Sequence, residues 1–300
     1  MNAVTPCKVR RGCYTTLKAK GVKSKNVFPF PYTNFLLSNY YGIIKKGGDI
    51  MLEKLKEIVV LVGEKLLDQK KETFFIKNKK DEFDYVTELD LKTQKSLQES
   101  LKKEFGDIPF FAEENGYDKK PESSEYWLID PIDGTVNFSK GFPEYCISVA
   151  YIKDNEVEIG VIFAPQMNML FYAEKNKGAY LNNEKIYCSK ENELNKSMIL
   201  LSNFRGVTYK YVETLEKEVL RLRLLGTAAL QICYVAAGYC EAFISLKAFP
   251  WDIAAGFLIL KEAGGVVKDL NEKEVDFFES KSIFSNKFIS PDLIKKVKNL

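Results

Sequence analysis

Hydrophobic and polar positions follow a helical period in two segments that precede the middle of the chain. Apolar residues recur every three or four positions across 52–69, which predicts an amphipathic helix. The charged segment 77–84 is then expected to be a loop. A second helix is predicted from an N-cap at Thr87 to Phe105, with Asp90 in the first turn, where the helix dipole favours a negative charge.

Short apolar runs bounded by turn residues predict strands through the rest of the chain. In the middle of the chain the predicted strands are 126–130, 145–152, 157–164 and 169–174. Their close spacing favours an antiparallel or mixed sheet. Farther on, the predicted strands are 198–202, 221–225 and 241–246, and the predicted helices are 209–220, 227–238 and 251–264, before two short strands and a helix from Pro291. This alternation predicts a layered α/β architecture with two sub-domains that meet around the acidic segments.

The first fifty residues show no sustained helical period and are strongly basic. Residues 1–50 hold nine Lys or Arg and one acid, and are predicted to be a disordered leader or an upstream extension that native translation omits. Gly47-Gly48-Asp49 can be encoded by a strong bacterial ribosome-binding sequence, and Met51 follows it closely. We therefore expect translation to start at Met51; peptides from residues 1–50 in the native protein would contradict this.

Composition narrows the chemistry mainly through one absence, that of histidine among 300 residues. Without an imidazole the chain has no serine–histidine or cysteine–histidine nucleophile pair and no zinc site that needs a histidine ligand. The six cysteines form no CxxC pair, so free thiols are expected rather than disulfides. Catalysis must therefore use carboxylates, hydroxyls, lysines, thiols or hard metal ions.

Hydropathy and charge argue against two classes of partner. No run reaches the roughly 18 apolar residues of a membrane span, which predicts a cytoplasmic protein without membrane contact. The formal charge of +3 comes from the leader, because residues 51–300 carry 35 basic and 40 acidic side chains, a net charge of −5. A nucleic-acid partner is therefore not expected.

Four acidic segments stand out because apolar or glycine-rich sequence flanks them: Thr87–Asp90, Ala112–Asn115, Asp130–Thr135 and Trp251–Asp252. Each places an acid at the end of a predicted strand or in the first turn of a predicted helix. Ligands bind at such ends in layered α/β proteins. The four segments together are therefore the predicted functional site.

The DPIDGT segment carries the strongest signal. Asp130 is predicted to end an apolar strand, Pro131 to fix a turn, and Asp133 to project just after it. Two carboxylates and an intervening carbonyl are the hard oxygen ligands that Mg²⁺ prefers. Gly134 lets backbone amides approach an anion, and a short helix from Thr135 would present them to a phosphate. The alternative is a structural Asp-Pro turn whose second aspartate caps a helix.

The motifs WLIDPIDGTVNF, AEEN and PWDIAAG, with AGG shortly after, closely resemble those of the inositol monophosphatase family. Its members are Mg²⁺-dependent, lithium-sensitive phosphatases of small phosphate monoesters, and some are also fructose-1,6-bisphosphatases. The resemblance covers residues 52–298 and finds no counterpart for 1–50. It implies an α/β fold (α+β in some schemes), a layered αβαβα sandwich of the sugar-phosphatase type, and a homodimer. It also implies a metal-binding half, about 51–190, and a substrate half, about 191–300.

The metal ligands follow from the same resemblance, which implies two or three Mg²⁺ ions per site. Glu113, Asp130 and the carbonyl of Ile132 would hold the first ion, and Asp130, Asp133 and Asp252 the second. Two such ions neutralise a phosphate dianion, lower the pKa of bound water and stabilise the leaving alkoxide.

The catalytic residues that the resemblance implies are Asp90, Glu113, Glu114 and Thr135, which would orient the attacking water and a third, weakly held metal. Taken without the other motifs, Glu113 and Glu114 are instead expected to be a solvated pair. In the charged loop, Lys77 or Lys79 would approach the third metal.

The substrate contacts also rest on the resemblance. They fall on the metal site, on the start of the predicted helix 227–238 and just before Trp251: Asp133, Gly134, Thr135, Gly226, Thr227, Ala228, Ser245, Lys247 and Asp252. Thr227 is also predicted to be the N-cap of its helix. Trp251 either packs under the metal site or is an ordinary core residue.

One position departs from the inositol-specific members of the family. Six residues before Trp251 they place a glutamate that accepts hydrogen bonds from inositol hydroxyls, and this chain has Ser245. Serine is shorter and uncharged, and the nearby Lys247 would pair with a second phosphate. The combination suits fructose 1,6-bisphosphate, unless Lys247 is only a solvated surface lysine.

The predicted function is Mg²⁺-dependent hydrolysis of a small sugar or polyol phosphate, with inositol 1-phosphate as the first candidate. Fructose 1,6-bisphosphate, histidinol phosphate, adenosine 3′,5′-bisphosphate and NADP(H) stay open as substrates. A non-enzymatic alternative is a binding role in transcription or RNA processing, which only the basic leader supports.

Overall fold

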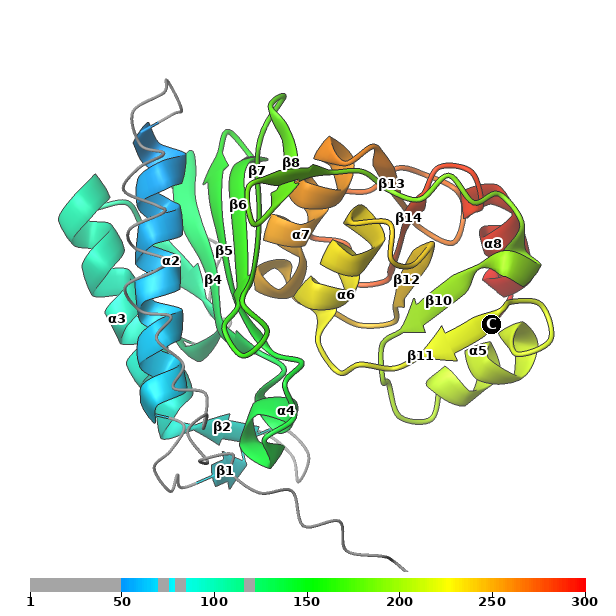
Figure 1. Ribbon diagram of the computed structural model, residues 1–300, viewed down its shortest axis with the longest axis horizontal. Helices are drawn as coiled ribbons and strands as arrows, with labels where there is room; N and C mark the ends of the chain where they lie inside the picture. Colours follow the sequence, from blue (N-terminus) through cyan, green and yellow to red (C-terminus); the bar gives the residue numbers. More distant parts are fainter. Residues whose placement is uncertain (1–49, 70–75, 79–84, 116–121) are drawn as a thin grey trace, which may run out of the picture. The chain divides into compact units, whose positions relative to one another are not determined.

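The computed structural model describes four stretches of the chain, which Figure 1 shows in colour: residues 50–69, 76–78, 85–115 and 122–300. The chain divides into two units, 1–47 and 48–300, and every described residue belongs to the second. The predictions for the leader up to residue 49 and for the side chains of Lys77 and Lys79 lie outside the described residues.

Seven α-helices lie in the described part of the chain: α2 (Ile50–Gln69), α3 (Glu88–Phe105), α4 (Thr135–Lys140), α5 (Thr208–Leu215), α6 (Ala228–Ala236), α7 (Pro250–Glu262) and α8 (Ser290–Val297). Two single turns of 3-10 helix accompany them: η1 (Glu113–Asn115) and η2 (Leu194–Lys196). The predicted helices α2, α3, α6, α7 and α8 are confirmed to within two residues at each end, whereas α5 ends at Leu215 rather than at residue 220.

The described strands form two large sheets and one small ribbon. The seven-stranded sheet has the order β3 (Phe110–Ala112), β4 (Glu125–Asp133), β5 (Cys146–Lys153), β6 (Glu156–Ala164), β7 (Met169–Glu174), β8 (Gly178–Leu181), β9 (Glu184–Ile186). The five-stranded sheet has the order β11 (Arg221–Arg223), β10 (Met198–Leu201), β12 (Ala242–Ser245), β14 (Ser282–Asn286), β13 (Gly265–Lys268). The ribbon pairs β1 (Ile76–Asn78) with β2 (Tyr85–Thr87).

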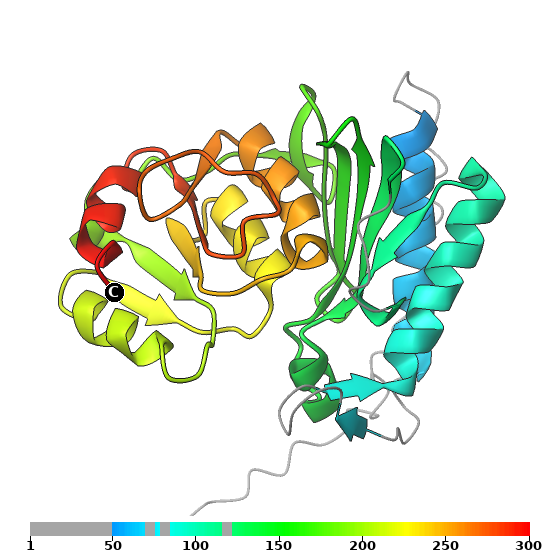
Figure 2. The same ribbon diagram turned by 180° about the vertical axis from the view of Figure 1, so that it is seen from behind.

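These elements stack in five layers, as Figures 1 and 2 show from opposite sides. Helices α2 and α3 cover one face of the seven-stranded sheet, and α7 covers the other. Helix α6 packs beside α7 in the layer between the two sheets, and the outer face of the five-stranded sheet is covered by α5 and α8. Both sheets are mixed, because β3 runs parallel to β4 and β10 runs parallel to β11 and β12, while the remaining pairs are antiparallel. The predicted αβαβα sandwich is confirmed.

Strands β10 and β12 of the five-stranded sheet are buried on both faces, and their side chains alternate between two cores. Leu200 and Phe243 point into the central core with α6 and α7. Their neighbours Ile199 and Ile244 point into the outer core with α5 and α8. This double burial explains why these strands appear in the sequence as continuous apolar runs.

Small residues on α7 let it approach its neighbours on two sides. A Cβ placed at Gly160 on β6 would lie 2.7 Å from the carbonyl oxygen of Ala255 on α7. On the side facing α6, a Cβ at Gly256 would lie 3.0 Å from the Ile232 side chain. The AAG part of the PWDIAAG motif is therefore a packing requirement, and it fixes the distance from α7 to the sheet.

The structure corrects the prediction for the DPIDGT segment. The strand does not end at Asp130: β4 continues through Pro131 to Asp133, with a register shift against β5 between the two aspartates. Proline has no N–H for the strand ladder, and an irregular position of this kind is where a strand tolerates it. Strands β1, β2, β3, β8 and β9 were not predicted from the sequence, since each has only three or four residues. The predicted loop 77–84 is wrong for its first two residues, which belong to β1.

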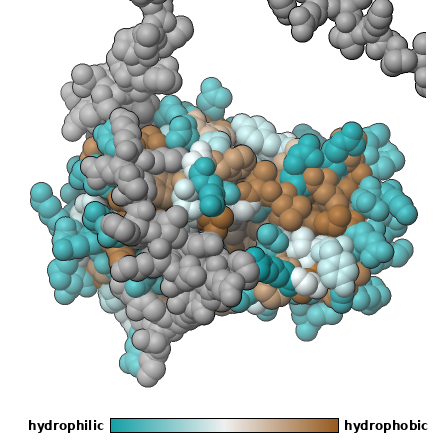
Figure 3. Space-filling view, turned by 90° about the horizontal axis from the view of Figure 1, so that it is seen from below, coloured by the Kyte–Doolittle hydropathy of each residue, from teal (hydrophilic) through white to brown (hydrophobic). Residues whose placement is uncertain are grey.

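The described residues contain no helix long and apolar enough to cross a membrane. Figure 3 shows apolar residues gathered on the side of the five-stranded sheet in that view. Large apolar side chains that stay exposed include Phe142, Leu220 and Leu224. Exposed apolar surface of this kind is typical of a contact with another chain.

Candidate functional site

The irregular end of β4 turns two buried aspartates in toward the same region. The backbone N–H of Ile132 donates a hydrogen bond to Asp130 Oδ1 at 3.0 Å, which fixes that carboxylate against its own strand. Asp130 is 2% exposed and Asp133 is 8% exposed. The register shift between them is thus what brings two acids from one short segment into a buried position.

Asp130 lies among other acids. Its pKa is raised well above the ordinary value by burial and then by the charges of Glu113, Asp133 and Asp252, and its carboxyl group shares a hydrogen bond with Glu113. In the described part of the chain, these three charges on Asp130 are all negative. Three segments that are far apart in the sequence, η1, β4 and α7, therefore supply one carboxylate cluster: Glu113, Asp130, Asp133 and Asp252.

Asp133 has a different environment, because it caps a distant helix. The backbone N–H groups of Ala228 and Ala229 donate to its two carboxylate oxygens at 3.1 and 2.7 Å, and the Cys146 thiol lies 3.7 Å from Oδ2. Burial raises the pKa of Asp133 to about 7, and the two amides act in the opposite direction. The cap that the sequence suggested for this aspartate exists, and it belongs to α6.

Thr227 was predicted to cap α6 and does not. It occupies the N-cap position with an extended backbone, but its side chain makes no capping hydrogen bond. Its Oγ1 is buried and has no hydrogen-bond partner among the described residues. Since the carboxylate of Asp133 takes the free amides at the start of the helix, the hydroxyl of Thr227 is left available beside it.

The hydroxyl of Thr135 links Asp90 to the end of β4. Thr135 Oγ1 lies 3.2 Å from Asp90 Oδ1 and 3.0 Å from the carbonyl oxygen of Ile132. A hydroxyl has one proton, so it donates to one of these acceptors at a time. Asp90 is fully buried in the first turn of α3, as predicted. The predicted catalytic residues Asp90 and Thr135 are thus in contact, next to the carbonyl proposed as a metal ligand.

Glu113 and Glu114 form the η1 turn, directly after β3. Both are only partly exposed, and the backbone N–H of Glu114 donates to Gln94 Oε1 of α3 at 2.9 Å. This arrangement differs from a solvated pair on a surface. Gln94 was not singled out from the sequence, because glutamine on a helix gives no pattern that distinguishes it.

Asp252 sits in the first turn of α7, and its Oδ2 accepts the backbone N–H of Phe249 at 2.8 Å. Trp251 is buried, stacks on Phe249 and meets Phe111 edge to face, with ring centroids 5.1 and 5.3 Å apart. The aromatic group therefore supports the turn that carries Asp252, and Trp251 both belongs to the core and packs behind the cluster.

The two glycines of the predicted substrate segments adopt positive φ and pack closely. Gly134 has φ 93°, and a Cβ there would lie 2.8 Å from the Thr227 methyl group. Gly226 has φ 83°, a conformation that side-chain-bearing residues rarely adopt. The segment that follows β4 and the segment that precedes α6 therefore lie against each other, as the sequence prediction requires.

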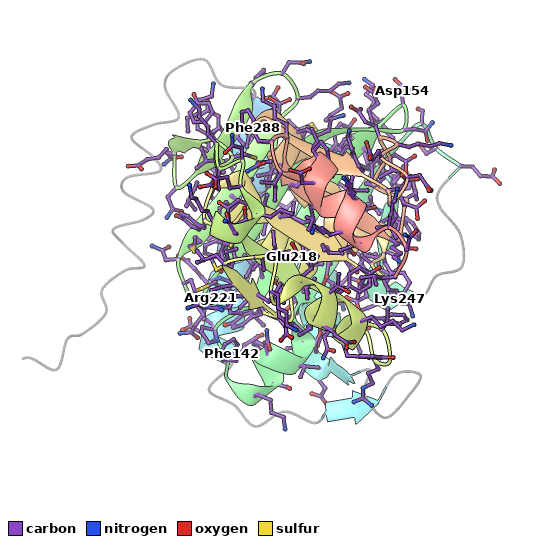
Figure 4. The ribbon with its side chains drawn as sticks, turned by 90° about the vertical axis from the view of Figure 1, so that its right-hand side faces the viewer. Phe142, Asp154, Glu218, Arg221, Lys247 and Phe288 are labelled. Carbon is purple, nitrogen blue, oxygen red and sulfur yellow. The ribbon has the colours of Figure 1, made fainter. Side chains whose placement is uncertain are left out.

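Ser245 and Lys247 lie near the end of β12 and differ in access. Ser245 is 1% exposed, and its Oγ has no hydrogen-bond partner among the described residues. Lys247 is exposed, with its ammonium group 5.8 Å from the ring centroids of both Phe204 and Phe249. In Figure 4 Lys247 lies at the surface, on the opposite side of the view from Arg221 of β11. Their contact with a substrate stays a prediction.

The donor set of the cluster fits a hard divalent cation. Carboxylate oxygens that repel one another in a buried position are stabilised by positive charge. As the described side chains stand, no three acidic or cysteine groups are already arranged to hold a metal ion. These carboxylates already have protein partners: Asp133 and Asp252 accept backbone amides, and Asp130 forms a hydrogen bond with Glu113.

Comparison with known proteins gives the family of this chain. The model of the inositol monophosphatase family matches residues 39–300. The match begins before Met51, so the expectation that residues 1–50 have no counterpart is wrong for residues 39–50. A fructose-1,6-bisphosphatase/inositol-1-monophosphatase of Thermotoga maritima is 41% identical over 214 residues, which cover 71% of this chain and 82% of the relative. A Nus factor SuhB of Pasteurella multocida is 34% identical over 195 residues, 63% of this chain and 73% of that protein.

Solved structures share the fold over most of their length. An inositol monophosphatase of Thermotoga maritima superposes with a TM-score of 0.77 at 38% identity and covers 81% of this chain and 95% of its own. An IMPase/NADP phosphatase solved with Mg²⁺ and phosphate gives a TM-score of 0.73 at 27% identity, with 81% and 95% coverage. By its sequence and by its fold, this chain belongs to the inositol monophosphatase family.

Proposed function

We propose that this protein hydrolyses the phosphate monoester of a small sugar or polyol, with Mg²⁺ held by the carboxylate cluster. The observation that carries the proposal is the convergence of four acids from η1, β4 and α7 beside the start of α6. Buried acids that lie close together, as Glu113, Asp133 and Asp252 do around Asp130, have a cation as their natural ligand. A homologous structure that contains Mg²⁺ and phosphate supports this choice of cation and substrate class.

The residues that would hold Mg²⁺ are those of the sequence prediction. Glu113, Asp130 and the Ile132 carbonyl suit one ion, and Asp130, Asp133 and Asp252 suit a second. When bound, Mg²⁺ supplies charge neutralisation for the phosphate and lowers the pKa of a bound water. No imidazole is needed for this chemistry, in agreement with a sequence that contains no histidine.

The attacking water is oriented by the Thr135 hydroxyl and Asp90. When Thr135 Oγ1 donates its proton to Asp90 Oδ1, its lone pairs can accept a hydrogen bond from a water molecule. That water then has an oxygen lone pair directed away from Thr135. Glu114 follows Glu113 in η1, and its backbone is anchored through Gln94. The half-buried backbone at Gly134 and Thr135 is proposed to receive the phosphate oxygens, because its amides stand at the start of α4.

Inositol 1-phosphate is the first candidate substrate. The proposal draws on the relatives, whose names include inositol-1-monophosphatase and inositol monophosphatase 1. The segment Gly226–Ala228 would face the polyol, and the unsatisfied Oγ1 of Thr227 is a group that a ligand hydroxyl can satisfy.

Fructose 1,6-bisphosphate is the second candidate, and Ser245 and Lys247 favour it. The buried Ser245 gives no exposed carboxylate for inositol hydroxyls, while Lys247 carries an exposed charge at the end of the same strand. The Thermotoga maritima relative is named for both activities. Lys247→Gln should then raise KM for fructose 1,6-bisphosphate by about tenfold, the effect of one charged contact, and leave KM for inositol 1-phosphate unchanged.

A substrate panel tests the proposed function. Phosphate release is measured with inositol 1-phosphate, fructose 1,6-bisphosphate, histidinol phosphate, adenosine 3′,5′-bisphosphate and NADP⁺, each with Mg²⁺ and with excess EDTA. Mg²⁺-dependent release from at least one substrate is expected, with inhibition by LiCl, since a related staphylococcal enzyme has been solved as a LiCl-soaked inhibitory complex. Absence of release from all five would overturn the enzymatic proposal.

The same panel separates the enzyme from a binding protein. Because some relatives are named Nus factor SuhB, a binding role in transcription is the alternative function. RNA retention by a chain that lacks residues 1–50 would support that role, whereas retention that needs the leader and is lost with salt would be non-specific electrostatics.

The proposed functional unit is a homodimer, as in the family. The exposed side chains of Phe142, Leu220 and Leu224 supply apolar surface for such a contact. Light scattering after size exclusion gives the mass directly, and a monomer at micromolar concentration would contradict this.

A further inference from the structure

Asn137 in the first half of α4 joins two parts of the site and has no role in the catalytic set described above. Its Nδ2 donates to the carbonyl oxygen of Glu144 at 2.7 Å and to the carbonyl oxygen of Leu225 at 2.6 Å. Because both partners are acceptors, the amide orientation is fixed and both of its hydrogens are used. Aspartate, which has the same shape, would place an oxygen against the same two carbonyls.

The two carbonyls belong to segments that lie far apart in the chain. Glu144 lies two residues before the start of β5, and its side chain accepts a hydrogen bond from the hydroxyl of Tyr234 on α6 at 2.7 Å. Leu225 directly precedes Gly226, where an added Cβ would lie 3.0 Å from Asn137 Nδ2. The Asn137 amide is therefore packed against the backbone that leads into the proposed sugar-facing segment.

The start of α6 is held by two kinds of link. One is ionic, from Asp133 to the amides of Ala228 and Ala229. The other is neutral, from Asn137 to the Leu225 carbonyl. Asp133 is also a proposed ligand of Mg²⁺, so its carboxylate would bind both the cation and the amides of α6. The Asn137 amide has no such second task.

We propose that Asn137 is a positioning residue that sets the place of the sugar-facing segment 226–228 relative to the phosphate-facing segment 133–135. The proposal rests on the proposed function, because it assigns those two segments to the two ends of one substrate. Asn137 touches neither end itself. It determines how well a polyol fits once the phosphate is bound.

Asn137→Asp should therefore weaken binding only of substrates whose hydroxyl groups contact the sugar-facing segment. KM for the polyol phosphate that the wild-type enzyme prefers should rise by about tenfold, the effect of losing two net hydrogen bonds. KM for 4-nitrophenyl phosphate, which has no polyol hydroxyls, should change by less than about twofold, and so should the Mg²⁺ concentration for half-maximal rate. A merely structural role would lower the rate with both substrates alike.

Asn182→Asp is the matched control. Asn182 also bridges two backbone groups, the N–H of Leu170 at 2.8 Å and the carbonyl of Asn168 at 2.9 Å, in the turn between β8 and β9. It should leave both KM values unchanged. Asn137→Ala, which removes the same donors without adding a carboxylate, serves if Asn137→Asp does not fold, and should show the same selective rise in KM.

Hydrogen exchange provides a readout that does not depend on turnover. In Asn137→Asp or Asn137→Ala, peptides that cover residues 224–230 should exchange at least about tenfold faster than in the wild type, with peptides from α2 unchanged. Unchanged exchange in 224–230, or equal rises in KM for both substrates, would overturn the positioning role. If the wild type hydrolyses neither substrate, the proposed function fails, and exchange alone then decides whether Asn137 positions the segment.

Discussion

Asp130 and Asp133 are buried aspartates of one strand, and the groups around them differ in charge. The region around Asp130, built from β4, η1 and the start of α7, surrounds it with further acids. The region around Asp133, at the start of α6, offers it two backbone amides. Burial raises the pKa of both aspartates; the neighbouring acids raise that of Asp130 further, whereas the two amides act to lower that of Asp133, which stands at about 7.

The difference shows how the site divides its tasks. Backbone dipoles at a helix start stabilise an anion without any ion from solution. A group of like charges needs a cation instead. One end of the irregular segment in β4, at Asp133, is therefore already linked to α6 by backbone amides, and the other end, at Asp130, lies among acids whose repulsion a metal would relieve.

The largest expected effect is on turnover. Asp130→Asn and Asp133→Asn should each lower kcat/KM by about 10³-fold or more, because each removes charge from the position where the reacting phosphate is stabilised. Phosphate release under saturating Mg²⁺ measures this. Asp107→Asn, a change at a largely exposed residue, is the control and should keep full activity. Near-normal Mg²⁺-dependent activity in either site variant would exclude the proposed site.

The next effect is on the pH dependence of stability without metal. Both aspartates have pKa values raised on folding, so the folded state binds more protons than the unfolded state above pH 4, and stability falls as pH rises toward about 7 for Asp133. Each extra proton corresponds to about 1.4 kcal/mol per pH unit. Urea unfolding in EDTA should show this decline, and the stabilisation by Mg²⁺ should be larger at pH 8 than at pH 5.5. A metal effect that shrinks as pH rises would contradict it.

A smaller effect is expected where α7 meets the sheet. Gly160→Ala should cost about 1–3 kcal/mol, because the added methyl group meets the backbone of Ala255, and it should also lower activity by displacing Asp252. Gly106→Ala is the control: its φ of 84° makes it destabilising, but nothing lies within 4 Å of the added Cβ and the site is remote. Thermal unfolding and phosphate release are measured on both variants. Full activity and full stability of Gly160→Ala would contradict this packing argument.

The smallest effect separates the two aspartates directly. In EDTA at pH 8, Asp130→Asn should be more stable than Asp133→Asn by about 1 kcal/mol, the value of a helix cap. Both lose a buried charge, but only the second also loses acceptors for the amides of Ala228 and Ala229. Equal stability of the two variants, measured by urea unfolding, would mean that the amide links contribute nothing.

The cluster of acids was predictable because each acid has a strong local context. Asp90 and Asp252 fall in the first turns of regular amphipathic or apolar helices, and Glu113 follows a short strand. The order of elements along the chain then brings these ends together in a layered fold. The layers, and the convergence of these acids, follow from patterns that extend over many residues.

The details that were missed depend on contacts between distant segments. Thr227 has the residue type of a helix cap, yet a carboxylate 94 positions earlier in the chain takes the amides. Pro131 has the residue type of a turn, yet pairing with β5 continues the strand past it. The two carbonyl partners of Asn137 cannot be inferred from its neighbours, because one of them lies 88 positions away.

The close fit of α7 against β6 and α6 bears on how substrate preference changes between descendants of one ancestral gene. A helix whose small residues already touch backbone on one side and a side chain on the other cannot accept larger residues without moving Asp252. New specificities are therefore expected to arise by replacements outside this helix. The exposed positions Phe204 and Lys247, which follow β10 and β12, can change without disturbing the interior.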